Sequence, residues 1–267
     1  MSEFMKTFPL LDVVHHAHDL KSLYFPKLPE PVSPGQFYML WLPGVDEKPF
    51  SVSDVLEDRV EITVRGIGPF TNKVLECQPG TYFGLRGPFG NGFQLCDNML
   101  VVGGGCGVAP VRYLAKQLEA QGLRYTLAVG TRSADDLLFA DEYEAAGVAI
   151  ATEDGSLGHQ GLVTDLVRPM LESGSYSCLA ASGPEPMLLA LRQLALEHKV
   201  PVQLSFERYM KCGVGVCGQC CMDGSGIRLC VEGPVLDEAQ MAGISELGRP
   251  HRDATGQRHT ESRVCKA

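Results

Sequence analysis

Short apolar segments with the character of β-strands occupy the first third of the chain. The segments at 35–42, 59–66 and 81–87 are rich in aromatic and β-branched residues and are bounded by Pro, Gly or Asp. Strands of this length and spacing predict an antiparallel sheet or small barrel over residues 1–95. A single helical pattern interrupts them, at residues 70–77.

Between residues 96 and 200, apolar strands alternate with helical segments. Two of the helices carry apolar residues at i, i+3, i+4 and i+7, which places them on one face: Val111, Leu114, Ala115 and Leu118 in the first, and Met187, Ala190, Leu191 and Leu194 in the last. Further helices are predicted near 136–147 and after Gly161. The predicted strands are 98–104, 125–130, 147–152 and 177–182.

This alternation predicts βαβ units and a parallel sheet. The overall prediction is a multi-domain fold of the α/β plus β class. An antiparallel barrel fills residues 1–95, a parallel-sheet domain fills 96–200, and a cysteine-rich segment with a polar tail fills 201–267.

Charge and composition narrow the classes of function. The formal net charge is −9, which argues against a nucleic-acid partner, because that binding depends on clustered Lys and Arg. The first residues lack the apolar run of a secretory signal, and no stretch of about 18 uncharged apolar residues predicts a membrane span. We therefore expect a cytoplasmic protein with reduced thiols.

Ten cysteines in such a protein need an explanation other than disulfides, and five of them lie within residues 209–234. Cys212, Cys217 and Cys220 form C-x4-C-x2-C, and Cys230 follows after nine residues. The first spacing is the plant-type [2Fe–2S] ligand pattern. Glycines between the cysteines allow a loop to wrap closely around a cluster, and its N–H groups can bond the sulfurs.

Two other interpretations of the cysteine segment stay open. Four cysteines can hold structural zinc, although zinc sites usually show two C-x2-C pairs. A redox pair of Cys217 and Cys220 would leave the other two cysteines unexplained. Outside the segment, we expect most of the scattered cysteines to be small buried apolar side chains: Cys77, Cys96, Cys178 and Cys265.

A glycine-rich turn follows the predicted strand at 98–104. In the sequence GGGCGVAP (103–110), the glycines Gly103, Gly104, Gly105 and Gly107 would let the backbone approach a pyrophosphate at the start of a helix, where Pro110 suits the first turn. The alternative is an ordinary tight strand–helix turn. Cys106 lies inside this turn, and we place it near the ligand without assigning it chemistry.

The barrel region has two candidate flavin-binding stretches. KPFSVSD (48–54) offers an aromatic ring for stacking and a hydroxyl for a polar edge, and TVRGIGPFT (63–71) offers Arg65 and Thr71 for phosphate. Each can also be an ordinary strand or turn. A flavin links the parts, because a nicotinamide transfers two electrons as hydride and a [2Fe–2S] cluster takes one.

Together these stretches resemble the ferredoxin–NADP reductase superfamily. More narrowly, KPFSVSD, VRGIGPFT, GPFGNGF, VVGGGCGVAP, ASGPEPM and ERYMKCGVGVCGQC with CVEGP are similar to the electron-transfer subunits of the NAD-linked, type B dihydroorotate dehydrogenases. The tail stretch GRPHRDATG resembles archaeal members. The resemblance covers essentially the whole chain.

The resemblance implies the residues of each site. FAD would contact Lys48, Pro49, Phe50, Ser51, Thr63, Val64, Arg65, Phe70 and Thr71, with Lys48 in place of the family's arginine. The glycine turn would bind NAD. The cluster ligands would be Cys212, Cys217, Cys220 and Cys230, as the spacing also predicts.

The resemblance also implies a partner. A separate FMN-containing subunit would oxidise dihydroorotate in pyrimidine (UMP) biosynthesis, and two copies of each subunit would form a heterotetramer. Electrons would pass to the cluster, then to FAD and to NAD+. The alternative is a related flavin subunit of a hydrogenase, a sulfite reductase or a ferredoxin–NADP reductase complex.

Overall fold

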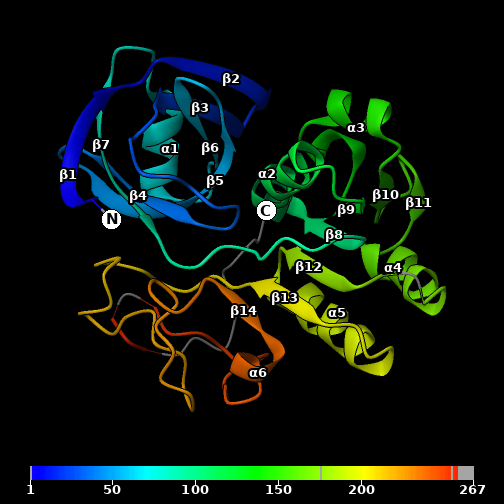
Figure 1. The fold of residues 1–267 in the computed structure, drawn as a ribbon. Helices are drawn as coiled ribbons and strands as arrows, with labels where there is room; N and C mark the ends of the chain where they lie inside the picture. Colours follow the sequence, from blue (N-terminus) through cyan, green and yellow to red (C-terminus); the bar gives the residue numbers. More distant parts are fainter. Residues whose placement is uncertain (1, 175, 254, 258–267) are drawn as a thin grey trace.

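The computed structural model describes residues 2–174, 176–253 and 255–257. Three parts follow one another along the chain (Figure 1): a curled antiparallel sheet, a sheet flanked by helices, and a turn-rich C-terminal segment. The predicted fold class is therefore confirmed. Among the described residues, no helix has the length and hydropathy needed to span a bilayer.

The N-terminal half-barrel is one seven-stranded antiparallel sheet with the order β1-β7-β4-β5-β6-β3-β2. Its edges approach each other where β1 contacts β3. Buried apolar side chains such as Phe25, Tyr38, Leu40 and Ile62 fill its interior. Helix α1 (Pro69–Glu76) lies against β6. The strands are β1 (Ser2–Pro9), β2 (Asp12–Ala17), β3 (Leu20–Pro26), β4 (Phe37–Leu42), β5 (Asp46–Val55), β6 (Arg59–Arg65) and β7 (Tyr82–Phe89).

The second sheet has the order β11-β10-β9-β8-β12-β13-β14 and is parallel except for β14. Alternate residues of β8 face opposite layers: Met99 and Val101 pack with α2, and Leu100 and Val102 pack with α4 and α5. Burial on both faces explains the continuous apolar run of this strand. The strands are β8 (Met99–Gly104), β9 (Tyr125–Thr131), β10 (Ala149–Thr152), β11 (His159–Gln160), β12 (Cys178–Ser182), β13 (Val202–Ser205) and β14 (Val235–Asp237).

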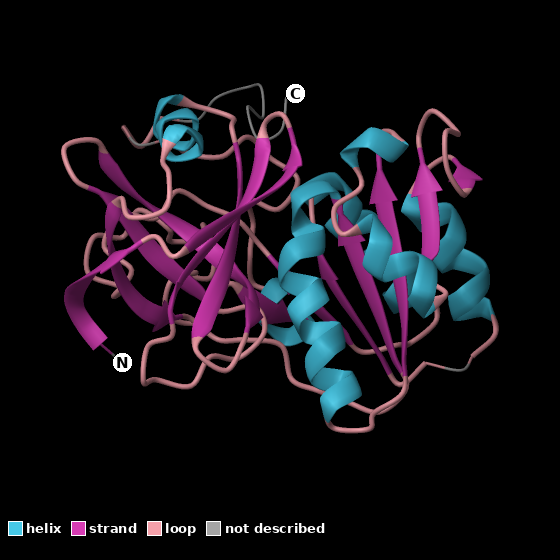
Figure 2. Ribbon diagram, turned by 90° about the horizontal axis from the view of Figure 1, so that it is seen from above, coloured by secondary structure: helices cyan, strands magenta, loops and turns pink. Residues whose placement is uncertain are grey.

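Helices cover both faces of this sheet (Figure 2). They are α2 (Val108–Ala120), α3 (Ala140–Ala146), α4 (Val163–Glu172) and α5 (Glu185–Glu197), and the short α6 (Glu238–Met241) follows β14. The helical stretch predicted near 136–147 is confirmed in its second half, where α3 lies. Phe139 has a left-handed backbone (φ 58°), which separates a 3₁₀ turn over Ala134–Asp136 from α3.

The C-terminal segment is not a separate globule. Its first strand, β13, pairs with β12, and β14 pairs with β13, so two strands beyond residue 200 extend the central sheet. The remainder consists mostly of turns and lies beneath the half-barrel (Figure 1). Its buried side chains Met222 and Leu229 share one core with Phe37, Met39 and Phe89 of the barrel.

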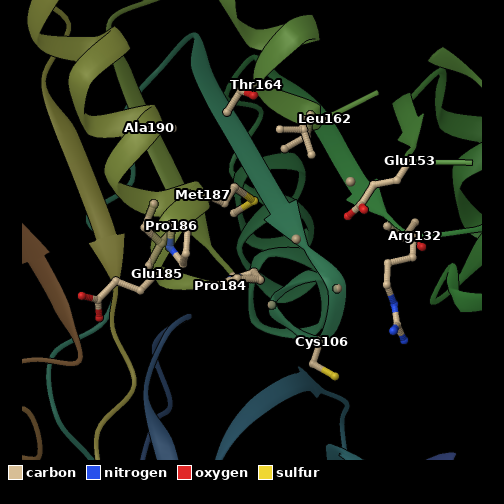
Figure 3. Close-up of a pocket in the computed structure, with 18 of the residues that line it drawn as sticks. Cys106, Arg132, Glu153, Leu162, Thr164, Pro184, Glu185, Pro186, Met187 and Ala190 are labelled. Carbon is tan, nitrogen blue, oxygen red and sulfur yellow. The ribbon is translucent and has the colours of Figure 1, made fainter. Parts of the chain in front are cut away.

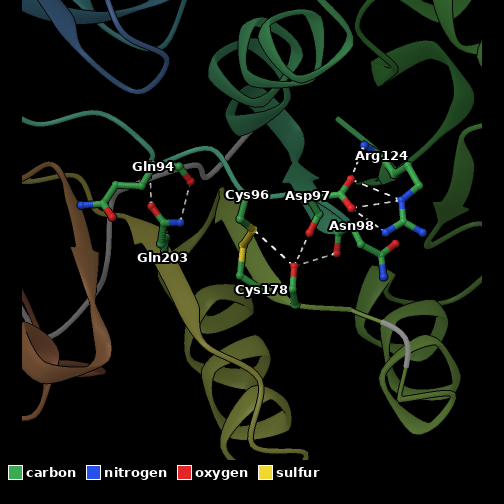
Figure 4. Close-up of a disulfide and its surroundings, with 8 residues drawn as sticks. Gln94, Cys96, Asp97, Asn98, Arg124, Cys178 and Gln203 are labelled. Atoms are coloured by element: carbon green, nitrogen blue, oxygen red, sulfur yellow. Dashed lines mark hydrogen bonds and ion pairs between the residues drawn. A yellow bond between two sulfur atoms is a disulfide. The ribbon is translucent and has the colours of Figure 1, made fainter. Parts of the chain in front are cut away.

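One expectation about the scattered cysteines is wrong. Cys96 and Cys178 pack against the apolar core as predicted, but they form a disulfide (Figure 4). The bond joins Cys96, which precedes β8, to Cys178, the first residue of β12, at the amino end of the parallel strands. Cys77 packs partly buried against the barrel core. Cys265 lies outside the described residues.

A buried arginine joins the half-barrel to the second sheet. Arg112 of α2 is 7% exposed, and its Nη1 lies 2.8 Å from an oxygen of Glu61 in β6. Its Nε and Nη2 donate to Glu142 of α3 at 2.7 and 2.6 Å. The guanidinium also stacks on the Phe139 ring, 4.1 Å from its centroid. These contacts fix α2 against the barrel wall.

Replacing Arg112 should therefore be costly. We expect Arg112→Met to lower the free energy of unfolding by about 3–5 kcal/mol, because Glu61 is left as an unpaired buried charge. Urea unfolding followed by fluorescence of the single tryptophan, Trp41, measures this.

The matched control is Arg124→Met, which breaks the exposed Arg124–Asp97 pair and should leave the free energy of unfolding nearly unchanged, because water screens that pair. Equal losses of unfolding free energy in the two variants would contradict the view that the buried pair stabilises the fold more than an exposed pair does.

Candidate functional site

The four predicted ligand cysteines lie in two pairs. The backbone N–H of Cys217 lies 3.5 Å from Sγ of Cys212, and the N–H of Cys230 lies 3.5 Å from Sγ of Cys220. A binuclear cluster binds each of its two irons through two thiolates, so two pairs fit it. Within the described ranges, no three Cys, His, Asp or Glu side chains gather around a point that could hold a single metal ion. The two cysteine pairs are therefore consistent with the ligand set of a binuclear cluster.

The loop favours the thiolate form of two of these cysteines. Burial acts to raise the pKa of Cys212, but hydrogen bonds from the backbone of Cys217 and Val214 lower it to about 6. The Cys230 side chain hydrogen-bonds Cys220 and lowers the pKa of that thiol to about 7, while the same contact raises the pKa of Cys230. Thiolates are the form of cysteine that binds iron.

Glycine is required in this loop for two reasons. Gly213 and Gly215 have φ of +74° and +78°, which side chains disfavour. A Cβ at Gly213 would also lie 3.0 Å from the Phe89 ring, and one at Gly215 would lie 2.7 Å from Val231. The loop is thus packed against the barrel end on one side and against the turn that contains Val231 on the other.

A pocket of about 250 Å³ lies where the three parts of the chain meet. The barrel contributes Pro49, Phe50, Ser51, Thr63, Arg65 and Thr71, and the glycine turn contributes Cys106, Gly107 and Pro110. Ser182, Ser205, Phe206, Glu207, Arg208, Met210 and Pro234 come from the ends of β12 and β13 and from the cysteine segment. Apolar walls with a few hydroxyls, two guanidinium groups and one carboxyl suit a flavin ring and its polar edge.

Three residues of the implied flavin set lie elsewhere. Lys48 does not line the pocket, because its Nζ pairs with Asp46 at 2.5 Å and sits 5.2 Å from the Tyr209 ring centroid. Val64 points into the barrel core. Phe70 is buried and stacks on Phe50, with centroids 6.2 Å apart, so it supports the wall from behind.

Two further members of the set have their polar atoms differently engaged. Thr71 Oγ1 accepts the N–H groups of Ile67 and Gly68 at 2.9 and 3.0 Å, which holds the turn before α1. Arg65 donates from Nη2 to Asp136 at 3.3 Å, and its buried Nε has no hydrogen-bond partner among the described residues, with the nearest Asp19 oxygen 3.9 Å away. An unsatisfied guanidinium N–H at the pocket fits an anionic group such as the flavin diphosphate.

A larger cleft of about 510 Å³ opens beside this pocket. It lies at the carboxyl ends of β8 and β12, where the strand order reverses, which is the usual ligand position in such sheets. Gly104, Gly105 and Gly107 line it, whereas Gly103 packs under Val108 and Val111. A Cβ at Gly107 would lie 2.3 Å from the Ser182 carbonyl oxygen, so this turn needs glycine.

The cleft has two chemically different sides (Figure 3). Arg132 and Glu153 lie on one side, and Pro184, Pro186 and Met187 lie on the other. The polar side suits ribose and phosphate, and the apolar side suits a flat ring. The arrangement fits an extended dinucleotide.

The pocket and the cleft share six residues: Arg65, Ile67, Cys106, Gly107, Phe206 and Glu207. Glu207 is the acid among them. Its side chain is exposed to solvent within the cleft. The protein around the carboxyl still desolvates it, and this raises its pKa. A group that holds a proton more readily than usual therefore stands between the two cavities.

Residues 206–208, which follow β13, are not among the predicted site residues. A strand predicted at 202–205, after Pro201, would have indicated them, because ligands bind at the carboxyl ends of parallel strands.

A buried ion cluster lies behind this stretch. Arg208 pairs with Glu185 and Glu246 at 2.8 Å each, and His251 lies 3.2 Å from Glu185. The contacts tie the start of α5 to the cysteine segment and to the tail. Burial acts to raise the Glu185 pKa, but the His251 and Arg208 partners lower it to about 2.

The loop glycines yield a first prediction for this site. We expect Gly215→Ala to lose most bound iron and acid-labile sulfide, because the new Cβ adds a clash with Val231 to about 1–2 kcal/mol of left-handed strain. Gly226→Ala is the matched control, since Gly226 has φ +75° and open space at its Cβ. Equal iron content in the two variants would show that the clash is harmless.

The Glu185 cluster yields a second prediction, on pH. A folded pKa below the ordinary 4.5 means that the ionised carboxylate stabilises the fold above about pH 4.5, and that this stabilisation is lost as the pH falls towards 2. The free energy of unfolding of the wild type should exceed that of Glu185→Gln by about 3 kcal/mol at neutral pH. Urea unfolding between pH 3 and 7 measures the difference, and a gap that stays constant with pH would refute the assignment.

Comparisons with known proteins agree with this geometry. Residues 207–242 match the family described as the iron–sulfur cluster binding domain of dihydroorotate dehydrogenase B. A chain from Methanothermobacter thermautotrophicus named "Probable dihydroorotate dehydrogenase B (NAD(+)), electron transfer subunit" is 45% identical over 232 residues, which cover 85% of this chain and 86% of that protein. One of the same name from Methanocaldococcus jannaschii is 41% identical, covering 84% and 87%.

Among solved structures, the NADH-dependent reduced ferredoxin–NADP oxidoreductase studied for flavin-based electron bifurcation superposes with a TM-score of 0.79 at 28% identity, covering 87% of this chain and 88% of that one. The ferredoxin reductase of carbazole 1,9a-dioxygenase shares the fold, with a TM-score of 0.63 at 22% identity over 75% of this chain and 68% of that one. The identities and coverages confirm the resemblance, and the chain belongs to the family of electron transfer subunits of dihydroorotate dehydrogenase B (NAD+).

Proposed function

We propose that this chain takes electrons from a dihydroorotate-oxidising partner subunit at a [2Fe–2S] cluster and passes them through FAD to NAD+. Its relatives carry the corresponding name. The observation that carries the proposal is the position of the smaller pocket. It touches the start of the cysteine segment on one side and shares residues with the nucleotide cleft on the other.

The residues around this pocket give each group a defined task. FAD, when bound, would accept single electrons and deliver a hydride, which a cluster cannot do. Phe50, backed by Phe70, forms an apolar wall, Ser51 and Thr63 offer hydroxyls, and Arg65 offers its buried N–H to phosphate. The wall would exclude water from the ring, and the hydroxyls would bond its polar edge.

The partner would dock at the cysteine loop. Val216, inside the loop, is 84% exposed, and the neighbouring Cys217 is also exposed. An exposed apolar side chain next to a cluster ligand suits a surface that a second redox subunit covers. We further propose that this partner carries FMN, that two copies of each subunit assemble, and that the complex works in the cytoplasm in pyrimidine (UMP) biosynthesis.

Co-expression tests the proposal. The chain is produced anaerobically with an FMN-type dihydroorotate dehydrogenase subunit of the same genome, and dihydroorotate-dependent reduction of NAD+ is followed. We expect Cys217→Ser to lower this rate by at least ~100-fold, because the one-electron entry point is lost. NADH oxidation by a dye that accepts electrons from the flavin should remain.

The matched control is Cys221→Ser, since Cys221 adjoins Cys220 but is not an assigned ligand. It should keep both activities. A coloured complex that oxidises NADH but never couples to dihydroorotate would overturn the partner assignment. It would favour a hydrogenase, sulfite reductase or ferredoxin–NADP reductase complex, and the last agrees with the structural likeness at TM-score 0.79.

A further inference from the structure

One charged pair of the half-barrel reaches the cysteine loop directly. Arg86 of β7 donates from Nη1 to the carbonyl oxygen of Cys212 at 2.5 Å and from Nη2 to that of Lys211 at 3.3 Å. Its Nε and Nη2 also donate to the two oxygens of Glu47 in β5, at 2.6 and 2.8 Å. The guanidinium therefore binds the Glu47 carboxylate and also donates to two backbone carbonyl oxygens of the cysteine loop.

The fold places this pair with little freedom. Strand β4 runs between β5 and β7, and its residues Met39 and Trp41 stand opposite Arg86 and Glu47, respectively. The two side chains are only 14% and 21% exposed. Arg86 also lies 5.6 Å from the centroid of Phe89, the ring on which Gly213 packs. Charge thus acts on Lys211 and Cys212, and shape acts on the next residue of the loop, Gly213.

The pair has an electrostatic consequence. A reduced cluster carries one more negative charge than an oxidised one, and in a partly buried site a nearby charge acts with little screening. Net charge and hydrogen bonding around the cluster set its reduction potential. The Arg86 guanidinium favours the reduced state, and the Glu47 carboxylate opposes it.

We propose that Arg86 and Glu47 are a positioning pair that holds Cys212 in place and tunes the reduction potential of the cluster. The proposal rests on the proposed function only through the assignment of Cys212 as a cluster ligand. The partner subunit plays no part in it. The planar guanidinium of Arg86 donates hydrogen bonds to three acceptor groups. A lysine at this position would keep the charge but could not make all of these hydrogen bonds.

The test is an anaerobic redox titration of the purified full chain, followed by the electron paramagnetic resonance signal of the reduced cluster. We expect Arg86→Gln to disfavour reduction and Glu47→Gln to favour it, each by roughly tenfold, which is 59 mV for a one-electron couple. Arg86→Lys should keep a potential near that of wild type but bind less iron per chain.

Arg59→Gln is the matched control. Arg59 forms a comparable two-bond pair with Asp58 at an exposed position of β6 and should leave the potential unchanged. Shifts of the same sign in Arg86→Gln and Glu47→Gln, or shifts no larger than in the control, would overturn the proposal. If Arg86→Gln fails to hold a cluster, the sign of the Glu47→Gln shift decides alone. A wild-type chain that never binds a cluster would instead defeat the proposed function.

Discussion

The buried ion pair between Arg112 and Glu61 is the contact on which the rest of the arrangement depends. Arg112 lies two residues after Pro110, and Glu61 lies two residues before Thr63, so the pair joins the two walls of the smaller pocket directly behind their lining residues. Neither wall makes a flavin-sized cavity alone. Because a buried charge is strongly destabilising without its partner, the pair also specifies one relative placement of the half-barrel and the helix-flanked sheet.

The cysteine segment depends on other contacts. The half-barrel meets the cysteine segment through a shared apolar core, through the Arg86 side chain and through closely packed backbone. The N–H of Asn91 donates to the carbonyl oxygen of Gly233, and Gly90 leaves no room for a side chain against the same carbonyl. Close backbone packing fixes the distance between the loop and the pocket more tightly than long side chains would. Electron transfer between cofactors benefits from such fixed distances.

Within the helix-flanked sheet, several stabilising contacts lie away from the parts that would bind ligands. The Cys96–Cys178 disulfide joins strands at the amino end of the parallel sheet, with the Arg124–Asp97 pair nearby (Figure 4), whereas the cleft opens at the carboxyl end. The Arg208 cluster is the exception, since Glu185 and His251 also line the cleft. Through it, the tail beyond the matched iron–sulfur domain becomes part of the cleft wall.

The sequence alone determined what is local. Strand and helix periodicity, the glycine turn at 103–107 and the spacing of Cys212, Cys217, Cys220 and Cys230 all follow from residue order, because each depends on neighbours along the chain. Tertiary structure decided what depends on distant partners. It placed Lys48 beside the ring of Tyr209, joined Cys96 to Cys178, and brought Phe206 and Glu207 to the junction of the two cavities. No periodicity marks these residues, since their surroundings come from segments up to more than a hundred positions away.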